Sequence, residues 1–111
     1  GPQSPYQLDE GRIVDTGRGK ALDGDDLVFM IDFNKGDSIP GVGSDPDVVE
    51  VRAETSAGTI TATSGTLVEA TGNYRAYVRL DPTRVDLAEL RVTLHIDDEQ
   101  WGETWIYRWT R

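Results

Sequence analysis

Four aromatic side chains near the end of the chain have the spacing to form one continuous surface. Trp101, Trp105, Tyr107 and Trp109 all occupy odd positions, so a strand places them on one face. Their ring faces could stack on sugar rings and form a carbohydrate platform. The same row could instead pack beneath a sheet or at a domain interface. We favour packing, because tryptophan in a small sandwich is usually core or interface material.

One member of this row is the best candidate for exposure. Ile106 points away from the row, so both faces of the strand carry apolar side chains. Trp101 lies at the turn end of the strand, next to Gly102. We therefore expect Trp101 to be the most exposed of the four aromatic residues.

Carboxylates gather at the turn that precedes the aromatic strand, at Asp97, Asp98, Glu99 and Glu103. A glycosidase needs two carboxyl groups about 5 to 10 Å apart across a cleft. Consecutive acids at a hairpin turn are ordinarily solvated turn residues. We therefore expect no catalytic residue here and classify the chain as not an enzyme.

Metal and cofactor sites are not indicated either. Two acidic groups could gather oxygen ligands for calcium, but neither has the spacing of an EF-hand; they are Asp23, Asp25 and Asp26, and Asp37, Asp45 and Asp47. His95 is the only histidine, and we expect it to be exposed on the polar face of its strand. With no phosphate-cradling glycine motif, we expect no cofactor, metal or nucleotide.

Composition limits the possible partners. The chain has 111 residues and a formal net charge of −9, which repels nucleic acid and anionic lipid surfaces. Cysteine is absent, so disulfides and thiolate metal sites are excluded. No apolar run approaches the roughly 20 residues that span a bilayer. These features predict one globular domain that neither binds nucleic acid nor inserts into a membrane.

Alternation of apolar and polar residues predicts short strands throughout. We expect strands over residues 12–16, 27–33, 49–54, 59–63, 74–80, 89–97 and 103–109, and a long loop over 34–47. Residues 67–70 are expected to form a short edge strand or a continuation of the preceding hairpin. The segments 49–54 and 59–63 are expected to form a hairpin, as are the last two strands. The core should contain Phe29, Ile31, Val51, Ala76, Val78, Leu90, Val92 and Leu94 together with one face of the aromatic strand.

These strands predict an all-β fold, an immunoglobulin-like β-sandwich of about seven antiparallel strands in two sheets. The run Asp86-x-Ala88-x-Leu90-x-Val92 has the spacing of the Asp-x-Ala-x-Tyr-x-Cys run that enters the penultimate immunoglobulin strand. Gly1-Pro2 is typical of a protease-cleaved tag. We therefore expect residues 1–8 to be a flexible segment and residues 9–111 to form the domain.

Four sequence blocks resemble one known family. They are Phe29-x-Ile31-Asp32-Phe33-x-x-Gly36, Gly72-Asn73-Tyr74-Arg75, Glu89-Leu90-Arg91-Val92-x-Leu94 and Glu103-Thr104-Trp105-Ile106-Tyr107-Arg108-Trp109. In order and approximate spacing they are similar to the C-terminal domain of the osmoregulated periplasmic glucan biosynthesis proteins G and D. Residues 34–47 and 57–72 carry little resemblance, and Trp101-Gly102 departs from the aliphatic and small hydroxyl pair usual in the family.

The resemblance implies a periplasmic protein that acts on β-1,2-glucan. Members of the family have a large N-terminal β-sandwich with the glucan cleft, followed by a smaller immunoglobulin-like domain, which this chain resembles. In members with glucanase activity the catalytic acids lie in the N-terminal domain, so none is carried over to a position here.

These observations lead to two functional hypotheses. The first is a noncatalytic accessory domain of glucan biosynthesis or processing, which docks on the N-terminal glucan-processing domain or on another periplasmic protein. The alternative is a carbohydrate-binding module that stacks β-glucan on exposed tryptophans. In either case, the contact residues are expected among Trp101, Trp105, Tyr107 and Trp109.

Overall fold

The computed structural model describes residues 11–21, 24–34 and 48–111. The predicted flexible segment 1–8 and nearly all of the predicted loop 34–47 lie outside these residues. The described chain contains seven strands and no helix: β1 (Ile13–Lys20), β2 (Leu27–Phe33), β3 (Val49–Thr55), β4 (Thr59–Val68), β5 (Asn73–Asp81), β6 (Leu87–Ile96) and β7 (Glu99–Thr110). The all-β prediction is confirmed.

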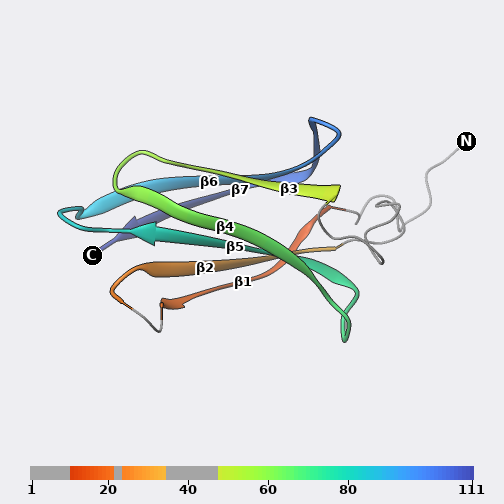
Figure 1. Ribbon diagram of the computed structural model, residues 1–111, viewed down its shortest axis with the longest axis horizontal. Coiled ribbons are helices and arrows are strands. Elements are labelled where there is room, and N and C mark those ends of the chain that lie inside the picture. The colour runs from red at the N-terminus through yellow and green to blue at the C-terminus, as the bar shows by residue number, and fades with distance from the viewer. Residues whose placement is uncertain (1–10, 22–23, 35–47) are drawn as a thin grey trace, which may run out of the picture.

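The strands form two antiparallel sheets that pack face to face. One sheet has the order β1-β2-β5-β4 and the other the order β3-β6-β7. Figure 1 shows the three-stranded sheet as one layer and the four-stranded sheet as the other. In constant-type immunoglobulin domains the first, second, fifth and fourth strands likewise share one sheet and the third, sixth and seventh the other. The predicted immunoglobulin-like sandwich is therefore the observed fold.

The core lies between the inner faces of the two sheets. The largest fully buried side chains alternate with outward-facing residues on the central strands β2, β5 and β6; they are Phe29, Ile31, Phe33, Tyr74, Val78, Leu80, Leu90, Val92 and Leu94. The residues predicted for the core are buried, except Val51 and, on the aromatic strand, Trp101 and Tyr107, which are partly buried against it. Asp86 stands immediately before β6, as the immunoglobulin-like spacing predicted.

The predicted hairpin of residues 49–54 and 59–63 is wrong. β3 pairs with β6 and β4 pairs with β5, so the short connection between β3 and β4 crosses from one sheet to the other. Gly58 lies in that connection with a φ of +79°, a conformation that favours glycine. A Cβ at this position would come within 2.7 Å of the Asp81 carbonyl oxygen. Alternation of apolar and polar residues indicates which face of a strand is buried but not which strand it pairs with. The same pattern therefore fits a β3–β4 hairpin and the observed crossing between the sheets.

β1 and β4, like β7, extend well beyond their predicted bounds. β1 continues past Gly17 to Lys20, because Gly17 and Gly19 pair opposite Met30 and Val28 within the β1–β2 ladder. β4 joins the predicted segments 59–63 and 67–70 into one edge strand that ends at Val68.

The last two strands form the predicted hairpin. Ile96 pairs with Glu99, which leaves Asp97 and Asp98 as a two-residue turn. Both have positive φ angles, 51° and 67°, as a type I′ turn requires, and aspartate tolerates this region better than most residues do. The acids at this tip therefore have a conformational role.

We expect Leu94→Ala to lower the free energy of unfolding by about 2 to 5 kcal/mol, because Leu94 is fully buried and its loss leaves a cavity. Urea denaturation measures the change. Leu87→Ala, at an exposed position of the same strand, is the control and should cost less than about 0.5 kcal/mol. Equal losses in the two variants would contradict the proposed core.

Candidate functional site

The aromatic row of β7 faces the core. Trp105 and Trp109 are only 7% and 6% exposed. The Phe29 ring centroid lies 5.7 Å from that of Trp105 and 5.6 Å from that of Tyr107, and Trp105 and Tyr107 stack in parallel at 5.4 Å. Such ring contacts add to the stabilisation from burial alone. The ring faces that a sugar would need are largely occupied by protein.

Trp101, the expected point of exposure, is less buried than Trp105 and Trp109 but is not open to solvent. Trp101 is partly buried, with its ring centroid 6.5 Å from that of Phe33. Ile106, on the opposite face of β7, is 73% exposed. The most exposed large apolar side chain of this strand is therefore the isoleucine, while all four aromatic residues pack inward.

A bulge in β7 keeps Trp101 on the aromatic face. Val92 pairs with Trp105 and Leu94 with Trp101, so a two-residue step along β6 matches a four-residue step along β7. An even number of extra residues preserves the alternation of faces. The bulge contains Gly102, whose φ is +83°.

The bulge also joins the two sheets. The backbone N–H of Glu103 donates to the Gly11 carbonyl oxygen at 2.8 Å, and the Glu103 carboxylate accepts from the backbone N–H of Ile13 at 2.6 Å. Gly11 and Gly102 touch along their backbones, since a Cβ on Gly11 would come within 2.3 Å of the Gly102 Cα. Glu103, considered above as a catalytic acid, therefore anchors the start of β1 to β7.

We expect Gly102→Ala to destabilise the protein by roughly 1 to 3 kcal/mol, because the positive φ and the contact with Gly11 both exclude a side chain. Thermal and urea unfolding measure the effect. Gly19→Ala is the matched control, since a Cβ there meets nothing within 4 Å. A Gly102→Ala protein as stable as Gly19→Ala would contradict this account of the bulge.

One carboxylate at the β6–β7 tip, Asp98, belongs to a surface ion network. Arg52 on β3 bonds to Asp98, and its Nε donates to the Glu50 carboxylate at 2.9 Å. These hydrogen bonds from Arg52 lower the pKa values of Asp98 and Glu50 below their ordinary range. A general acid requires the opposite shift, so this network supports turn structure rather than acid catalysis.

We expect Arg52→Gln to raise the pKa values of Asp98 and Glu50 toward those of free carboxylates, because it removes the charged donor. A folded-state pKa below the unfolded one stabilises the fold above about pH 4 and loses that effect as pH falls. The stability difference between wild type and Arg52→Gln should therefore narrow in acid. Carboxyl ¹³C titration measures the pKa values, and unchanged values in the variant would contradict the network.

His95 and the acidic loops complete the predicted site residues. His95 is half-buried rather than exposed, because β6 turns it beside Thr93, whose hydroxyl lies 3.0 Å from its Nε2. Asp26 accepts hydrogen bonds from Arg79 and Thr61. Among residues 11–21, 24–34 and 48–111 no three His, Asp, Glu or Cys side chains gather around a possible metal position. Asp23, Asp37, Asp45 and Asp47 lie outside the described residues.

The outer face of the four-stranded sheet is a partly apolar surface. Three half-buried side chains lie at its centre: Val28, Met30 and Tyr77. Met30 and Tyr77 pair directly across β2 and β5. Gly17 and Ser64 extend this row on the edge strands, so the flanks carry little side-chain bulk.

An ion pair lies at each end of the apolar centre along β2 and β5. Arg75 Nε and Nη2 donate to the two oxygens of the Asp32 carboxylate at 2.7 and 3.0 Å. Arg79 pairs with Asp26 at 2.8 Å toward the other end. The Asp32 side chain is only 6% exposed, so this bidentate pair is partly shielded from water and held in one geometry. We call Val28, Met30, Tyr77 and these two ion pairs the outer face of the four-stranded sheet.

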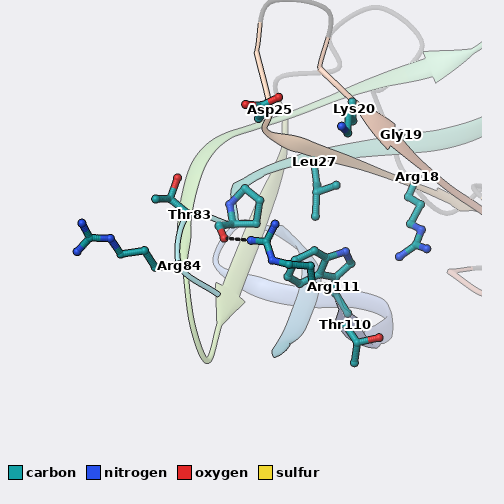
Figure 2. Close-up of a pocket in the computed structure, with 11 residues that line it drawn as sticks. Arg18, Gly19, Lys20, Asp25, Leu27, Thr83, Arg84, Thr110 and Arg111 are labelled. Atoms are coloured by element: carbon teal, nitrogen blue, oxygen red, sulfur yellow. Dashed lines mark hydrogen bonds between the residues drawn. The ribbon is translucent and has the colours of Figure 1, made fainter. Parts of the chain in front are cut away.

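A groove of about 780 Å³ opens between β1 and the end of β7. Figure 2 shows its lining, which comes from three parts of the chain that are distant in sequence. The lining residues are Arg18, Gly19, Lys20, Asp25, Leu27, Pro82, Thr83, Arg84, Trp109, Thr110 and Arg111. We call it the basic groove, after its four cationic side chains.

The basic groove exists because β1 turns charged residues inward. Arg18 pairs with Phe29 and Lys20 pairs with Leu27, and directly paired residues point to the same face of a sheet. Since Phe29 faces the core, Arg18 and Lys20 also lie on the inner face, at the edge of the sandwich. Charged groups resist burial, so the two layers do not close over them. Sequence reasoning missed this site because the cations come from separate segments.

Arg111 forms the opposite wall. Its Nε and Nη2 donate to the carbonyl oxygens of Val85 and Pro82 at 3.0 and 2.7 Å. Its guanidinium lies over the Trp109 ring, 5.6 Å from the centroid, as a cation–π contact. These contacts fix the position of Arg111 and cover part of Trp109.

Comparisons with known proteins identify relatives of the chain. Residues 2–109 match the model of the family described as periplasmic glucan biosynthesis protein, MdoG. The chain is 38% identical over 84 residues to a probable glucans biosynthesis protein D of Shewanella oneidensis, an alignment that covers 74% of this chain and 15% of the relative.

Proteins named G show similar matches. The glucans biosynthesis protein G of Shewanella frigidimarina is 30% identical over 83 residues, and that of Vibrio cholerae serotype O1 is 34% identical over 83 residues. Each alignment covers 75% of this chain and 14% of the relative. The chain thus corresponds to a small part of the length of these relatives. No helix in the described part of the chain is long and apolar enough to cross a membrane.

Proposed function

Because the chain belongs to the MdoG family of periplasmic glucan biosynthesis proteins, we propose that it is a noncatalytic docking domain of a larger periplasmic protein. Its occupant is the remainder of that protein, since the relatives are several times longer than the matched part. The contact surface in this proposal is the outer face of the four-stranded sheet. The larger remainder would then carry any chemistry on glucan.

The observation that carries the proposal is this outer face itself. Its half-buried Met30 and Tyr77 lie between two ion pairs, and the bidentate Asp32–Arg75 pair is already partly shielded from water. Prearranged polar groups around an apolar centre suit an interface, because little ordering is needed on contact. Interfaces between domains bury about 600 to 1,500 Å², an area that one sheet face of this size can supply.

The carbohydrate-binding alternative receives less support. Trp105 and Trp109 are buried and Tyr107 stacks on Trp105, so the β7 row offers no open ring surface comparable to a sugar platform. Trp101 and Tyr107 are the partly buried members of the row, and because Tyr107 already stacks on Trp105, Trp101 is the residue that we would test for glucan stacking.

We expect Met30→Glu to weaken binding of this domain to the separately expressed remainder of its parent protein by at least about tenfold, because a charge is placed in the apolar centre. Ala62→Arg, on edge strand β4 beside the same surface, is a second variant that does not alter β2. Both should keep a melting temperature near that of wild type. Surface plasmon resonance measures the affinities.

Ile106→Glu is the matched control, because Ile106 is exposed on the outer face of the opposite sheet. It should bind like wild type. Unchanged affinity in both Met30→Glu and Ala62→Arg would sink the proposal. Tight binding of β-1,2-glucan to the isolated domain, lost in Trp101→Ala, would instead support the carbohydrate-binding alternative.

A further inference from the structure

We propose that the basic groove is a binding site for a small organic anion, a phosphate or carboxylate attached to an apolar or ring-shaped body. This site is separate from the outer face of the four-stranded sheet. A ligand bound in the groove would therefore be additional to the docking partner.

The distribution of charge is the first argument. The chain has 11 Lys and Arg against 20 Asp and Glu, yet four of these cations line the basic groove, and among the described lining residues only Asp25 is acidic. By contrast, Arg52, Arg75, Arg79 and Arg108 are each paired with a carboxylate elsewhere on the surface. In a chain of net charge −9, this groove gathers more basic than acidic side chains among its described lining residues, which favours an anionic ligand.

The cations of the groove differ in their existing partners. Within the described residues, Arg18, Lys20 and Arg84 make no ion pair, and all three are exposed. Arg111 uses Nε and Nη2 for carbonyl oxygens and lies 3.7 Å from the exposed Asp86 carboxylate. A guanidinium carries five N–H donors, so Arg111 retains donors for a further acceptor. Arg18 and Lys20 are thus available to pair with an anion, and Arg111 is held in place as one wall of the groove.

Apolar side chains form the rest of the lining. Leu27 is partly buried, and Pro82 and Trp109 are buried beneath the groove. Figure 2 shows the Leu27 side chain among the labelled polar residues. A ligand with a nonpolar body gains from covering this floor while its anionic group meets the cations, the combination typical of small-molecule sites. Inorganic phosphate alone would meet the cations but would leave the apolar floor of the groove uncovered.

The turn at Arg84 is a second, independent observation. The backbone N–H of Val85 donates to the Pro82 carbonyl oxygen at 3.0 Å, and Arg84 within this turn has a φ of 61°. Glycine or asparagine is usual at a turn position with positive φ, and another residue there carries backbone strain. The Arg84 side chain extends away from the other labelled residues in Figure 2, at the rim of the groove. We assign the Arg84 side chain to long-range attraction of anions rather than to direct contact with the bound ligand.

A structural role could also explain the inward charges of β1. Arg and Lys on the inner face of an edge strand discourage edge-to-edge pairing with another molecule. That role predicts self-association when the charges are removed, but no saturable ligand. It does not account for an arginine in the strained turn at position 84.

The test is a titration of the ¹⁵N-labelled 111-residue chain with phenyl phosphate, up to millimolar concentrations, followed at the indole N–H of Trp109. We expect saturable shifts confined to the basic groove. The double variant Arg18→Gln/Lys20→Gln should bind about tenfold or more weakly, because charged hydrogen bonds are lost. Arg91→Gln removes an exposed charge on the opposite sheet and should bind like wild type.

Parallel titrations with benzoate, inorganic phosphate and phenyl β-glucoside identify the ligand chemistry. Tighter binding of phenyl phosphate than of benzoate assigns a phosphate ligand, and the reverse order assigns a carboxylate. Inorganic phosphate should bind more weakly than phenyl phosphate, and the uncharged glucoside should leave the groove unshifted.

Arg84→Gly separates binding from folding. It relieves the backbone strain, so the melting temperature should stay equal or rise, while phenyl phosphate binding should weaken about twofold from the loss of an exposed charge. Absence of saturable shifts at Trp109, or equal binding by the Arg18→Gln/Lys20→Gln variant, would overturn the proposal. Self-association of that double variant with unchanged anion binding would assign Arg18 and Lys20 to edge protection instead.

Discussion

The fold depends on the contact between the aromatic face of β7 and Phe29 of β2. Phe29 touches the rings of both Trp105 and Tyr107, which joins the three-stranded sheet to a central strand of the four-stranded one. Large aromatic side chains supply much of the apolar area that a domain of 111 residues can bury. The requirement to bury these rings explains why a row with the composition of a sugar platform packs inward.

This packing also determines which surfaces remain available for function. Because the aromatic row faces inward, the outward positions of β7 carry residues such as exposed Ile106. The outer face of the four-stranded sheet and the basic groove are then two surfaces that combine apolar and charged side chains. One combines apolar residues with closed ion pairs, and the other combines apolar residues with four cations, of which only Arg111 makes an ion pair among the described residues. The two surfaces therefore suit different partners.

Most strands could be predicted from the sequence because a half-buried strand records its orientation in alternation, as Tyr74 to Leu80 does. Pairing is recorded less directly, and the crossing between β3 and β4 at Gly58 was taken for a hairpin for that reason. The bulge at Gly102 left no trace in the pattern, since an even insertion preserves alternation. The basic groove required knowledge that Arg18 pairs with Phe29 and therefore faces inward.

The strand order has a consequence for how the chain folds. Three pairs of sequence neighbours, β1 with β2, β4 with β5 and β6 with β7, can form as local hairpins. The pairings of β2 with β5 and of β3 with β6 join distant segments and must wait for closure of long loops. Non-local pairing of this kind places all-β sandwiches among the slow folders, on a scale of about milliseconds to seconds. Until those two ladders form, the aromatic face of β7 is an exposed apolar surface of the β6–β7 hairpin, which favours aggregation. The excess of acidic residues gives partly folded chains the same charge, and their repulsion opposes that aggregation.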